Sequence, residues 1–376
     1  MTTQPLDGVL VVSLEQAVAA PIATCRLVDA GARVIKLERA EGDFARDYDD
    51  YANGQSTYFA WANRGKESVI VDIKNPDDLS FVKSLLSKAD VFVQNLAVGA
   101  AARSGLDSSQ LREDYPQLIT CDVSGYGEDG PYATMKAYDL LVQAESGLVS
   151  VSGHPGELGR VGVSVCDVAT GISVALAVNE ALHARVHSGK GSAIKISLFD
   201  VIAEWMTVPL LQYDYTGRAP DRVGLAHPSI VPYGGFVSSD NATVVISIQN
   251  QREWISLVTQ VLERPDLASN SRYSDNASRM TYRVEVDNIV QKVFATLSRK
   301  ELEKKLRSAR IAYGSVNTVS ELSTHPQLRR WTIQSETGDI SLPAHPDAVK
   351  PQRPDLWIPR LGEHTELIKE EFSGSS

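Results

Sequence analysis

The sequence of 376 residues has little cysteine, no excess of positive charge and no long uninterrupted apolar run. Its three cysteines, Cys25, Cys121 and Cys166, are too few and too widely spaced for a disulfide framework or a metal cluster. Acidic residues outnumber basic ones by 47 to 37, and this balance argues against nucleic acid or an anionic membrane as the main partner. No apolar run approaches the ~18 residues that cross a bilayer. The first residues lack a signal-peptide pattern, so we expect a cytoplasmic protein.

The usual phosphate-binding and metal-binding motifs are also missing. No Gly-x-Gly-x-x-Gly follows the first predicted strand, where residues 15–21 read Glu-Gln-Ala-Val-Ala-Ala-Pro, and no Walker sequence is present. The seven histidines are scattered, and His183 and His187 have no third ligand near them in the sequence. The sequence therefore predicts neither a tight pyrophosphate loop nor a metal site.

Short apolar runs alternate with amphipathic ones in the first part of the chain. The apolar runs are nearly continuous rather than alternating with polar residues, which is typical of parallel strands covered on both faces. One helix is predicted to begin at Pro21 and end at Gly31, and another to follow the capping pair Asn75-Pro76. The predicted strands are residues 8–13, 34–37, 68–72, 91–93, 118–123 and 193–197.

The pattern divides the chain into three parts. Residues 1–215 form a large α/β domain, whose last third is mostly helical, with helices predicted over residues 137–150, 168–187 and 198–212. Residues 216–324, with their β–β–α pattern, form a smaller α+β domain together with its linkers. The polar, proline-rich residues 325–376 are expected to return and pack on the large domain.

Three cations recur just beyond predicted strand ends: Arg39, Lys74 and Arg103. Ligands of parallel sheets lie outside the carboxyl ends of the strands, so three converging positive charges would suit a polyphosphorylated ligand. Ordinary surface charge at strand–helix junctions explains the same pattern equally well.

Asp167 is the most informative single residue. It follows the glycine-rich segment 152–162 and opens a long apolar helix, so it is either a simple capping carboxylate or a nucleophile. We expect the helix dipole and nearby amides to lower its pKa and keep it ionised. Pattern alone favours capping.

The residues resemble those of the class III (CaiB/BaiF-type) CoA-transferases, the family of formyl-CoA transferase and carnitine CoA-transferase, over essentially the whole chain. Six short motifs carry the resemblance. They are Pro-Leu-Asp-Gly at 5–8, Gly-Ala-Arg-Val-Ile-Lys-Leu-Glu-Arg at 31–39, Asn-Arg-Gly-Lys at 63–66, Val-Asp-Ile-Lys at 71–74, Ala-Tyr-Gly at 312–314 and Leu-Gly-Glu-His-Thr at 361–365. Gly162 and Asp167 match the family's Gly-x-x-x-x-Asp stretch, whose aspartate is the nucleophile. The resemblance implies a Rossmann-like parallel-sheet domain, a small α+β domain and an interlocked homodimer.

The same resemblance implies roles for further residues. Asp167 would be the nucleophile, and Tyr138 and Asp139 would border the acyl site and orient the substrate. CoA and acyl-CoA enter as substrates, with no tightly bound cofactor. The implied CoA contacts are Arg39, Val71, Lys74, Asn95, Leu96, Arg103 and Lys136.

Departures from the family bear on the substrate. Ser124 replaces one basic contact, and Gly224-Leu225-Ala226-His227-Pro228 replaces a glycine-run loop, so formyl or oxalate specificity is not expected. The sequence at residues 19–21, 42–46 and 63–66 is most similar to that of members that transfer CoA from succinyl-CoA to itaconate, mesaconate or citramalate. Arg46 and His227 are candidates for binding the second carboxylate of such an acid.

Two alternatives stay open. A 2-methylacyl-CoA racemase would share the fold, but the racemase branch uses a His-Asp pair where this sequence has Tyr138-Asp139. A non-catalytic acyl-CoA-binding protein would keep the CoA site without covalent chemistry at Asp167.

Overall fold

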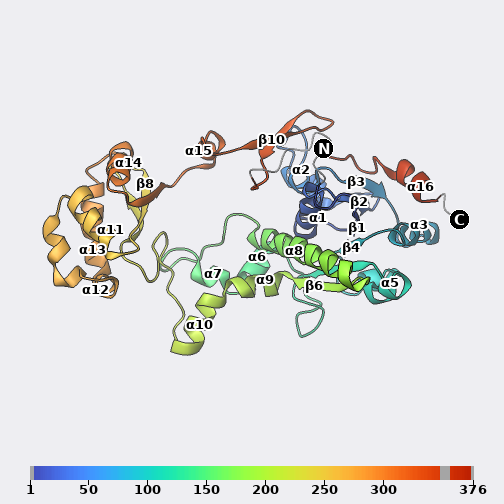
Figure 1. Cartoon of the computed structure of the whole chain (residues 1–376), viewed down its shortest axis with the longest axis horizontal. Helices are drawn as coiled ribbons and strands as arrows, with labels where there is room; N and C mark the ends of the chain where they lie inside the picture. The colour runs from blue at the N-terminus through green and yellow to red at the C-terminus, as the bar shows by residue number, and fades with distance from the viewer. Residues whose placement is uncertain (1–3, 348–355, 374–376) are drawn as a thin grey trace. The chain divides into compact units, whose positions relative to one another are not determined.

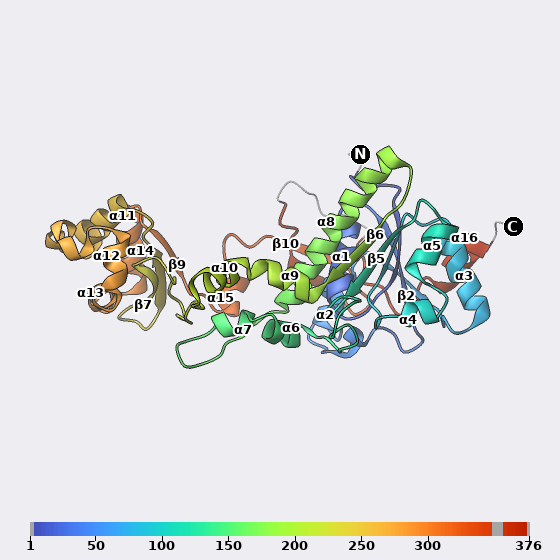
Figure 2. The same cartoon turned by 90° about the horizontal axis from the view of Figure 1, so that it is seen from below.

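The computed structural model describes residues 4–347 and 356–373. It divides into two compact units (Figures 1 and 2). The first unit comprises residues 1–148, 160–208 and 329–376, and the second comprises residues 149–159 and 209–328. Residues 149–159 thus group with the second unit, although they lie inside the large domain of residues 1–215 that the sequence predicts. Of the return segment 325–376, residues 348–355 and 374–376 lie outside the described residues.

The first unit is built on a six-stranded parallel sheet with the order β3-β2-β1-β4-β5-β6. This order reverses direction between β1 and β4, the arrangement in which Rossmann-like folds bind ligands beyond the carboxyl ends of the strands. The predicted α/β architecture is confirmed. The strands are β1 (Leu10–Leu14), β2 (Arg33–Glu38), β3 (Glu67–Ile70), β4 (Val91–Gln94), β5 (Ile119–Ser124) and β6 (Ala193–Ser197).

Helices cover both faces of this sheet, which explains why its strands are apolar throughout (Figure 2). On one face, alternate residues of the central strands pack against α1 and α8; on the other they pack against α3, α5 and α16. The helices of the unit are α1 (Ala19–Asp29), α2 (Thr57–Asn63), α3 (Pro76–Leu86), α4 (Ala100–Arg103), α5 (Ser108–Asp114), α6 (Asp139–Glu145), α8 (Val165–Ser188), α9 (Leu198–Trp205) and α16 (Thr365–Ser373), with a 3-10 helix at Phe44–Asp47.

The long helix α8 lies closest to α1 at a glycine. A Cβ on Gly171 would lie 2.8 Å from the Ala19 carbonyl oxygen and 2.8 Å from Cγ2 of Ile22, so only glycine permits this approach. By length and composition α8 is also the one helix among the described residues that could cross a membrane. Because its buried face contributes to the core of this unit, that property is weak evidence for a membrane span.

The C-terminal segment covers the edge of the sheet at β3. The backbone N–H of Gly362 donates to Ser68 Oγ at 2.9 Å, and Thr365 Oγ1 accepts from Ile70 N at 3.0 Å. Helix α16 then buries Ile368 and Phe372 against the α3 side of the core. The polar, proline-rich composition of this tail did not predict α16. It also did not predict the hairpin of β10 (Arg330–Ile333) and β11 (Ile340–Pro343).

The second unit has its own core around Trp254, Tyr273 and Phe294. Its antiparallel sheet has the order β7-β8-β9, and the unit is of the α+β type, as predicted. Its elements are β7 (Tyr233–Val237), β8 (Thr243–Ser247), α11 (Gln251–Ser256), a π-helix (Leu257–Val261), 3-10 helices (Pro265–Ser269 and Ser271–Tyr273), α12 (Asn276–Thr281), α13 (Arg283–Phe294), α14 (Arg299–Ser308), β9 (Ala312–Ser315) and α15 (Val319–Ser323). Two helices cross the boundary between the units, α7 (Leu148–Val151) and α10 (Thr207–Thr216).

Helix lengths differ from the prediction in two places. The helix expected over residues 137–150 is two short helices, α6 and α7, separated near Gly147, whose φ is +82°. The helix expected over residues 198–212 is interrupted at Met206 between α9 and α10. Apolar periodicity predicts where a helix packs, whereas these interruptions depend on local turns that periodicity does not register.

Candidate active site

Asp167 lies in the first turn of α8 and is half-buried in the first unit. Its burial, and then the negative charge of Asp139, raise the pKa of the Asp167 carboxyl to about 7. The expectation that the helix dipole would lower this pKa is therefore wrong. Removing the carboxylate from water and placing it beside a second carboxylate outweigh the favourable helix N-terminus.

Tyr138 and Asp139 are brought next to Asp167 by α6. Asp139 is the first residue of that helix, and one of its carboxylate oxygens accepts the backbone N–H of Cys166 at 2.7 Å. Its other oxygen accepts the Gln143 side-chain amide at 2.7 Å. Both oxygens of Asp139 thus already accept a hydrogen bond from the protein itself, and the role of Asp139 in orienting the substrate stays a prediction. The Tyr138 side chain is 58% exposed and remains available to a ligand.

An aromatic residue that was not predicted from the sequence, Tyr48, also lies at this site. Burial, and then the negative charges of Asp43, Tyr138 and Asp167, raise the pKa of Tyr48 to about 12, which puts the Tyr48 phenol among the acidic groups around the nucleophile. Tyr48 also packs edge-on against Tyr58, with ring centroids 5.3 Å apart. Tyr48 lies only two residues beyond Arg46, but no charge or spacing signal in the sequence pointed to it.

A strained turn lies at the carboxyl end of β1. Ala17 has a φ of +64°, which is uncommon for a residue with a Cβ, and its N–H donates to Asp43 Oδ1 at 3.0 Å. Ala17 and Val168 pack against the same small apolar cluster, so this turn and the start of α8 are neighbours. Non-glycine residues in this conformation persist where the surroundings fix them, and they cluster at functional sites.

The same turn explains what Asn95 does. The Asn95 side chain accepts the N–H of Gln16 at 2.9 Å and donates to the Gln16 carbonyl at 2.9 Å, joining the ends of β4 and β1. Its carboxamide is thus engaged at both ends, so the structure argues against a direct contact between that side chain and CoA. The adjacent Leu96 N–H donates to the side chain of Gln94 at 2.8 Å, which fixes the loop that we expected along the CoA path.

Lys74 and Arg103 line one groove of about 640 Å³ beyond the ends of β3 and β4. Within residues 4–347 and 356–373, neither the Lys74 ammonium nor the Arg103 guanidinium has a hydrogen-bond or ion-pair partner. Two unpaired cations in one groove are what a phosphorylated ligand requires. The remaining lining residues are Ile73, Leu79, Ala100, Ser104 and Gly105.

The other predicted CoA contacts differ in how available they are. The Arg39 side chain is 61% exposed and its Nε donates to the Gly42 carbonyl at 3.1 Å. Lys136 is exposed and has no side-chain partner among the described residues. Val71 is buried in the core, so only its backbone could reach a ligand.

Arg46 is fully engaged within the protein. Its guanidinium makes two hydrogen bonds to Glu38, at 2.7 and 2.9 Å, donates to the Pro359 carbonyl at 3.1 Å and lies 3.7 Å above the ring of Phe59. Burial by itself would raise the pKa of Glu38, but Arg46 and then Lys36 lower it to about 2. The structure therefore argues against Arg46 as the residue that binds a substrate carboxylate, and indicates that it stabilises the fold.

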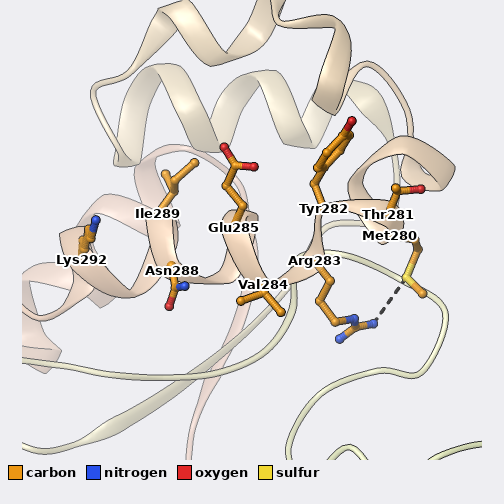
Figure 3. A pocket seen from close by; sticks show the side chains of 9 residues that line it. All are labelled: Met280, Thr281, Tyr282, Arg283, Val284, Glu285, Asn288, Ile289 and Lys292. Carbon is orange, nitrogen blue, oxygen red and sulfur yellow. Dashed lines mark hydrogen bonds between the residues drawn. The ribbon is translucent and has the colours of Figure 1, made fainter.

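His227 belongs to the second unit. Its ring stacks on Tyr233 with centroids 5.1 Å apart, its Nδ1 accepts from Ser229 N at 3.1 Å, and its carbonyl accepts from Arg283 at 2.5 Å. The Nε2 atom of His227 has no partner among the described residues. Arg283 also lines the 730 Å³ pocket of this unit on α12 and α13 (Figure 3), which contains no predicted site residue.

Cysteine thiols and possible metal ligands are the other reactive groups to place in the structure. All three cysteines are buried free thiols, and burial followed by the charge of Asp139 raises the pKa of the Cys166 thiol. In the described part of the chain, no three His, Cys, Asp or Glu side chains lie close enough to hold a metal ion. The chemistry of the site thus depends on carboxylates, phenols and the cations of the groove.

A parallel sheet with cations beyond its strand ends and a carboxylate at the start of a buried helix describes an enzyme that binds a phosphorylated carrier. Comparison with known proteins defines its class. Residues 6–365 match the model of CoA-transferase family III, and the chain belongs to that family. The match spans both units, so the family assignment covers the whole architecture and not the six-stranded sheet alone.

Relatives of similar length are named for several different substrates. The chain is 32% identical to the succinate–glutarate CoA-transferase of Agrobacterium fabrum, over 98% of the chain and 96% of that relative. It is 31% identical to the acetyl-CoA:oxalate CoA-transferase of Acetobacter aceti, with the same coverage. It is 30% identical to the succinyl-CoA:mesaconate CoA-transferase of Haloarcula hispanica, over 86% of the chain and 83% of that relative. The crystal structure of a CaiB/BaiF family protein from Brucella suis superimposes with a TM-score of 0.83 at 31% identity, covering 99% of this chain and 100% of that one.

Proposed function

We propose that this CoA-transferase moves CoA from a dicarboxylyl-CoA donor, such as succinyl-CoA, to a C4–C5 dicarboxylate such as itaconate, mesaconate or citramalate, with Asp167 as the nucleophile. The observation that carries the proposal is the half-buried carboxylate of Asp167 at the start of α8, with Tyr48 and Tyr138 close by. The names of the relatives support dicarboxylates as the substrate class.

The proposed reaction is a double displacement through covalent intermediates. The Asp167 carboxylate attacks the thioester carbonyl of the donor, which forms a mixed anhydride and releases the CoA thiolate. The thiolate attacks the Asp167 carbonyl, giving an aspartyl-CoA thioester and the free donor acid. The acceptor carboxylate then attacks that thioester, and the released thiolate attacks the acceptor acyl carbon to give the product and regenerate Asp167.

The proposed CoA site uses the unpaired cations of the first unit. Lys74 and Arg103 would contact phosphate groups in their shared groove, and Arg39 and Lys136 would add positive charge. The backbone of Val71 and the loop at Leu96 would line the path. Asn95 would act through the Gln16 turn that it holds, not by touching CoA.

The proposal also covers the second carboxylate of the substrate and the assembly of the protein. With Arg46 engaged by Glu38, His227 is our remaining candidate for the distal carboxylate of the acid, through its free Nε2 atom. We also propose that the protein is cytoplasmic and forms a homodimer. The homodimer is supported by apolar side chains that are widely exposed on three consecutive helices. They are Ile172, Leu176, Trp205, Val208, Leu210 and Leu211.

Trapping the covalent intermediate tests the proposed function. The wild-type protein, mixed with succinyl-CoA and then hydroxylamine, should carry a hydroxamate at Asp167 that peptide mass spectrometry detects. Asp167→Asn should carry none and should lose at least about 10³-fold in transfer rate. Glu180→Gln, the same chemical change at an exposed site on α8, should behave as wild type.

A donor-by-acceptor panel, read by chromatography of the acyl-CoA products, tests the substrate class. We expect the highest kcat/KM with C4–C5 dicarboxylates and a much lower value with oxalate or formate. Incorporation of deuterium from heavy water into a chiral 2-methylacyl-CoA, without movement of CoA, would instead establish the racemase alternative. Binding of acyl-CoA without a hydroxamate would establish a binding protein.

A further inference from the structure

The segment that presents Asp167 is held at both of its ends by a single short helix. At one end, Asp139 of α6 accepts the Cys166 N–H at 2.7 Å, directly before Asp167. At the other end, Gln143 of α6 accepts the Val161 N–H at 2.9 Å and donates to the Val161 carbonyl at 3.3 Å. The stretch from residue 161 to residue 166 is therefore fixed against α6 through three atoms of two side chains.

The two holding side chains also fix one another. The Gln143 amide donates to the second Asp139 oxygen at 2.7 Å, so neither residue can turn away without breaking a bond to the other. Gln143 is completely buried, where an unpaired amide would be costly. Asp139 and Gln143 thus form one rigid pair, which we call the α6 clamp.

The clamp replaces the cap that α8 lacks. Ser164 occupies the N-cap position of α8, but its side chain makes no capping hydrogen bond. Helix N-termini leave backbone N–H groups unpaired, and a side-chain oxygen usually accepts them from within the same segment. Here a carboxylate from another helix does so, which ties the first turn of α8, and with it Asp167, to the position of α6.

The clamp also sets the charge around Asp167. The groups that lie around Asp167 are Asp139 from α6, Tyr138 just before α6, Tyr48 just after the 3-10 helix at Phe44–Asp47, and Cys166 on its own helix. In the described part of the chain, neither Asp139 nor Asp167 forms an ion pair. Burial, and then the charge of Asp139, accordingly raise the pKa of Asp167 to about 7.

We propose that Asp139 and Gln143 are positioning residues of the transfer reaction: together they fix the turn that aims the Asp167 carboxylate, and Asp139 alone supplies a negative charge that opposes its ionisation. This proposal rests on the role of Asp167 proposed above. A nucleophile with an ordinary pKa would be fully ionised and solvated at neutral pH. Asp167, buried and next to Asp139, instead has a pKa raised to about 7, so its carboxylate is a stronger base, which increases its nucleophilicity towards a thioester.

The two clamp residues are separable by experiment, because one carries charge and the other does not. Asp139→Asn keeps an oxygen that can accept from Cys166 N and removes the charge, but its amide NH2 takes the place of the oxygen that accepts from Gln143. Gln143→Leu keeps the volume and loses the hydrogen bonds to Val161. The readout is the pH dependence of single-turnover formation of the Asp167-CoA thioester, with Glu180→Gln as the matched control on α8.

In the wild type and in Glu180→Gln, we expect the rate to rise with pH through a midpoint near 7. In Asp139→Asn, the midpoint should move down by ~1 pH unit or more, because a like charge is removed, without reaching the ordinary aspartate value, because burial remains. In Gln143→Leu, the midpoint should stay in place while the maximal rate falls ~10-fold or more through misorientation. Circular dichroism of each variant at the assay temperature identifies any that has unfolded.

Two results would overturn the proposal: an unchanged midpoint in Asp139→Asn, or an equal shift of the midpoint in both clamp variants. If Gln143→Leu does not fold, Asp139→Asn by itself still decides the question, because it keeps the size of the native residue and an oxygen for the Cys166 N–H, and the pH midpoint reports the charge that it removes. A wild-type protein that forms no thioester at Asp167 would contradict the proposed function itself, and the two failures are thus distinguishable.

Discussion

At the scale of single residues, the site depends on which polar side chains are already engaged. Arg46, Asn95 and Asp139 looked like ligand contacts in the sequence, yet each is bonded to other parts of the first unit. Lys74 and Arg103 have the same kind of sequence signal, and their side chains are unpaired in a shared groove. The sequence shows the residue type and its approximate position, but whether a side chain is already hydrogen-bonded depends on partners that are 4 to 313 residues away along the chain.

The raised pKa of Asp167 predicts a stability effect as well as a catalytic one. The folded protein holds the Asp167 proton more tightly than the unfolded chain does, so ionising this group costs stability as the pH rises from about 4 to about 7. A shift of about three pKa units corresponds to at most ~4 kcal/mol. Asp167→Asn should therefore be more stable than wild type at pH 8, and the gain should be smaller at pH 5.

Denaturant unfolding of both proteins at the two pH values measures this difference. An equal gain at pH 5 and pH 8 would mean that the substitution acts through packing and not through titration of the carboxyl. Asp167→Asn should therefore lose transfer activity and gain stability, because a charged nucleophile in a partly buried site destabilises the folded protein.

At the scale of elements, the crossing of α1 and α8 fixes where the nucleophile stands. Gly171 follows Asp167 by four residues, on the same side of α8, and a Cβ there would overlap the Ala19 carbonyl. Gly171→Ala should force the two helices apart, lower stability by about 1–3 kcal/mol and reduce kcat ~10–100-fold with little change in the KM for acyl-CoA.

The matched control for this prediction is Gly189→Ala at the other end of α8. Gly189 has a φ of +67° and open space around it, so alanine there should cost stability by about 1 kcal/mol without moving Asp167. Steady-state kinetics and thermal unfolding of the two variants separate the effects. Wild-type kcat in Gly171→Ala would disprove a positioning role for this contact.

At the scale of the whole molecule, the exposed apolar helices predict assembly. Helix α10 buries none of its ten residues within a single chain, although it carries Val208, Leu210 and Leu211. Large apolar side chains that find no cover within one chain are typical of interfaces. We expect a sedimenting mass of about twice 40.9 kDa at micromolar concentration.

Substitutions on the proposed interface make this prediction specific. Leu176→Lys combined with Leu211→Lys should weaken the dimer, whereas Leu367→Lys, on the exposed side of α16, should not. Sedimentation equilibrium of the three proteins provides the measurement. A wild-type mass of 40.9 kDa under these conditions would contradict the homodimer.

The sequence by itself determined the α/β class, the parallel sheet, the start of α8 at Asp167 and, through motifs spread over the chain, the family. These properties are local: apolar runs, capping residues and short motifs are readable without knowing what they contact. The tertiary structure alone decided the ionisation of Asp167, the engagement of Arg46, Asn95 and Asp139, and the approach of α8 to α1 at Gly171. Those depend on burial, on neighbouring charge and on hydrogen-bond partners that only folding brings together.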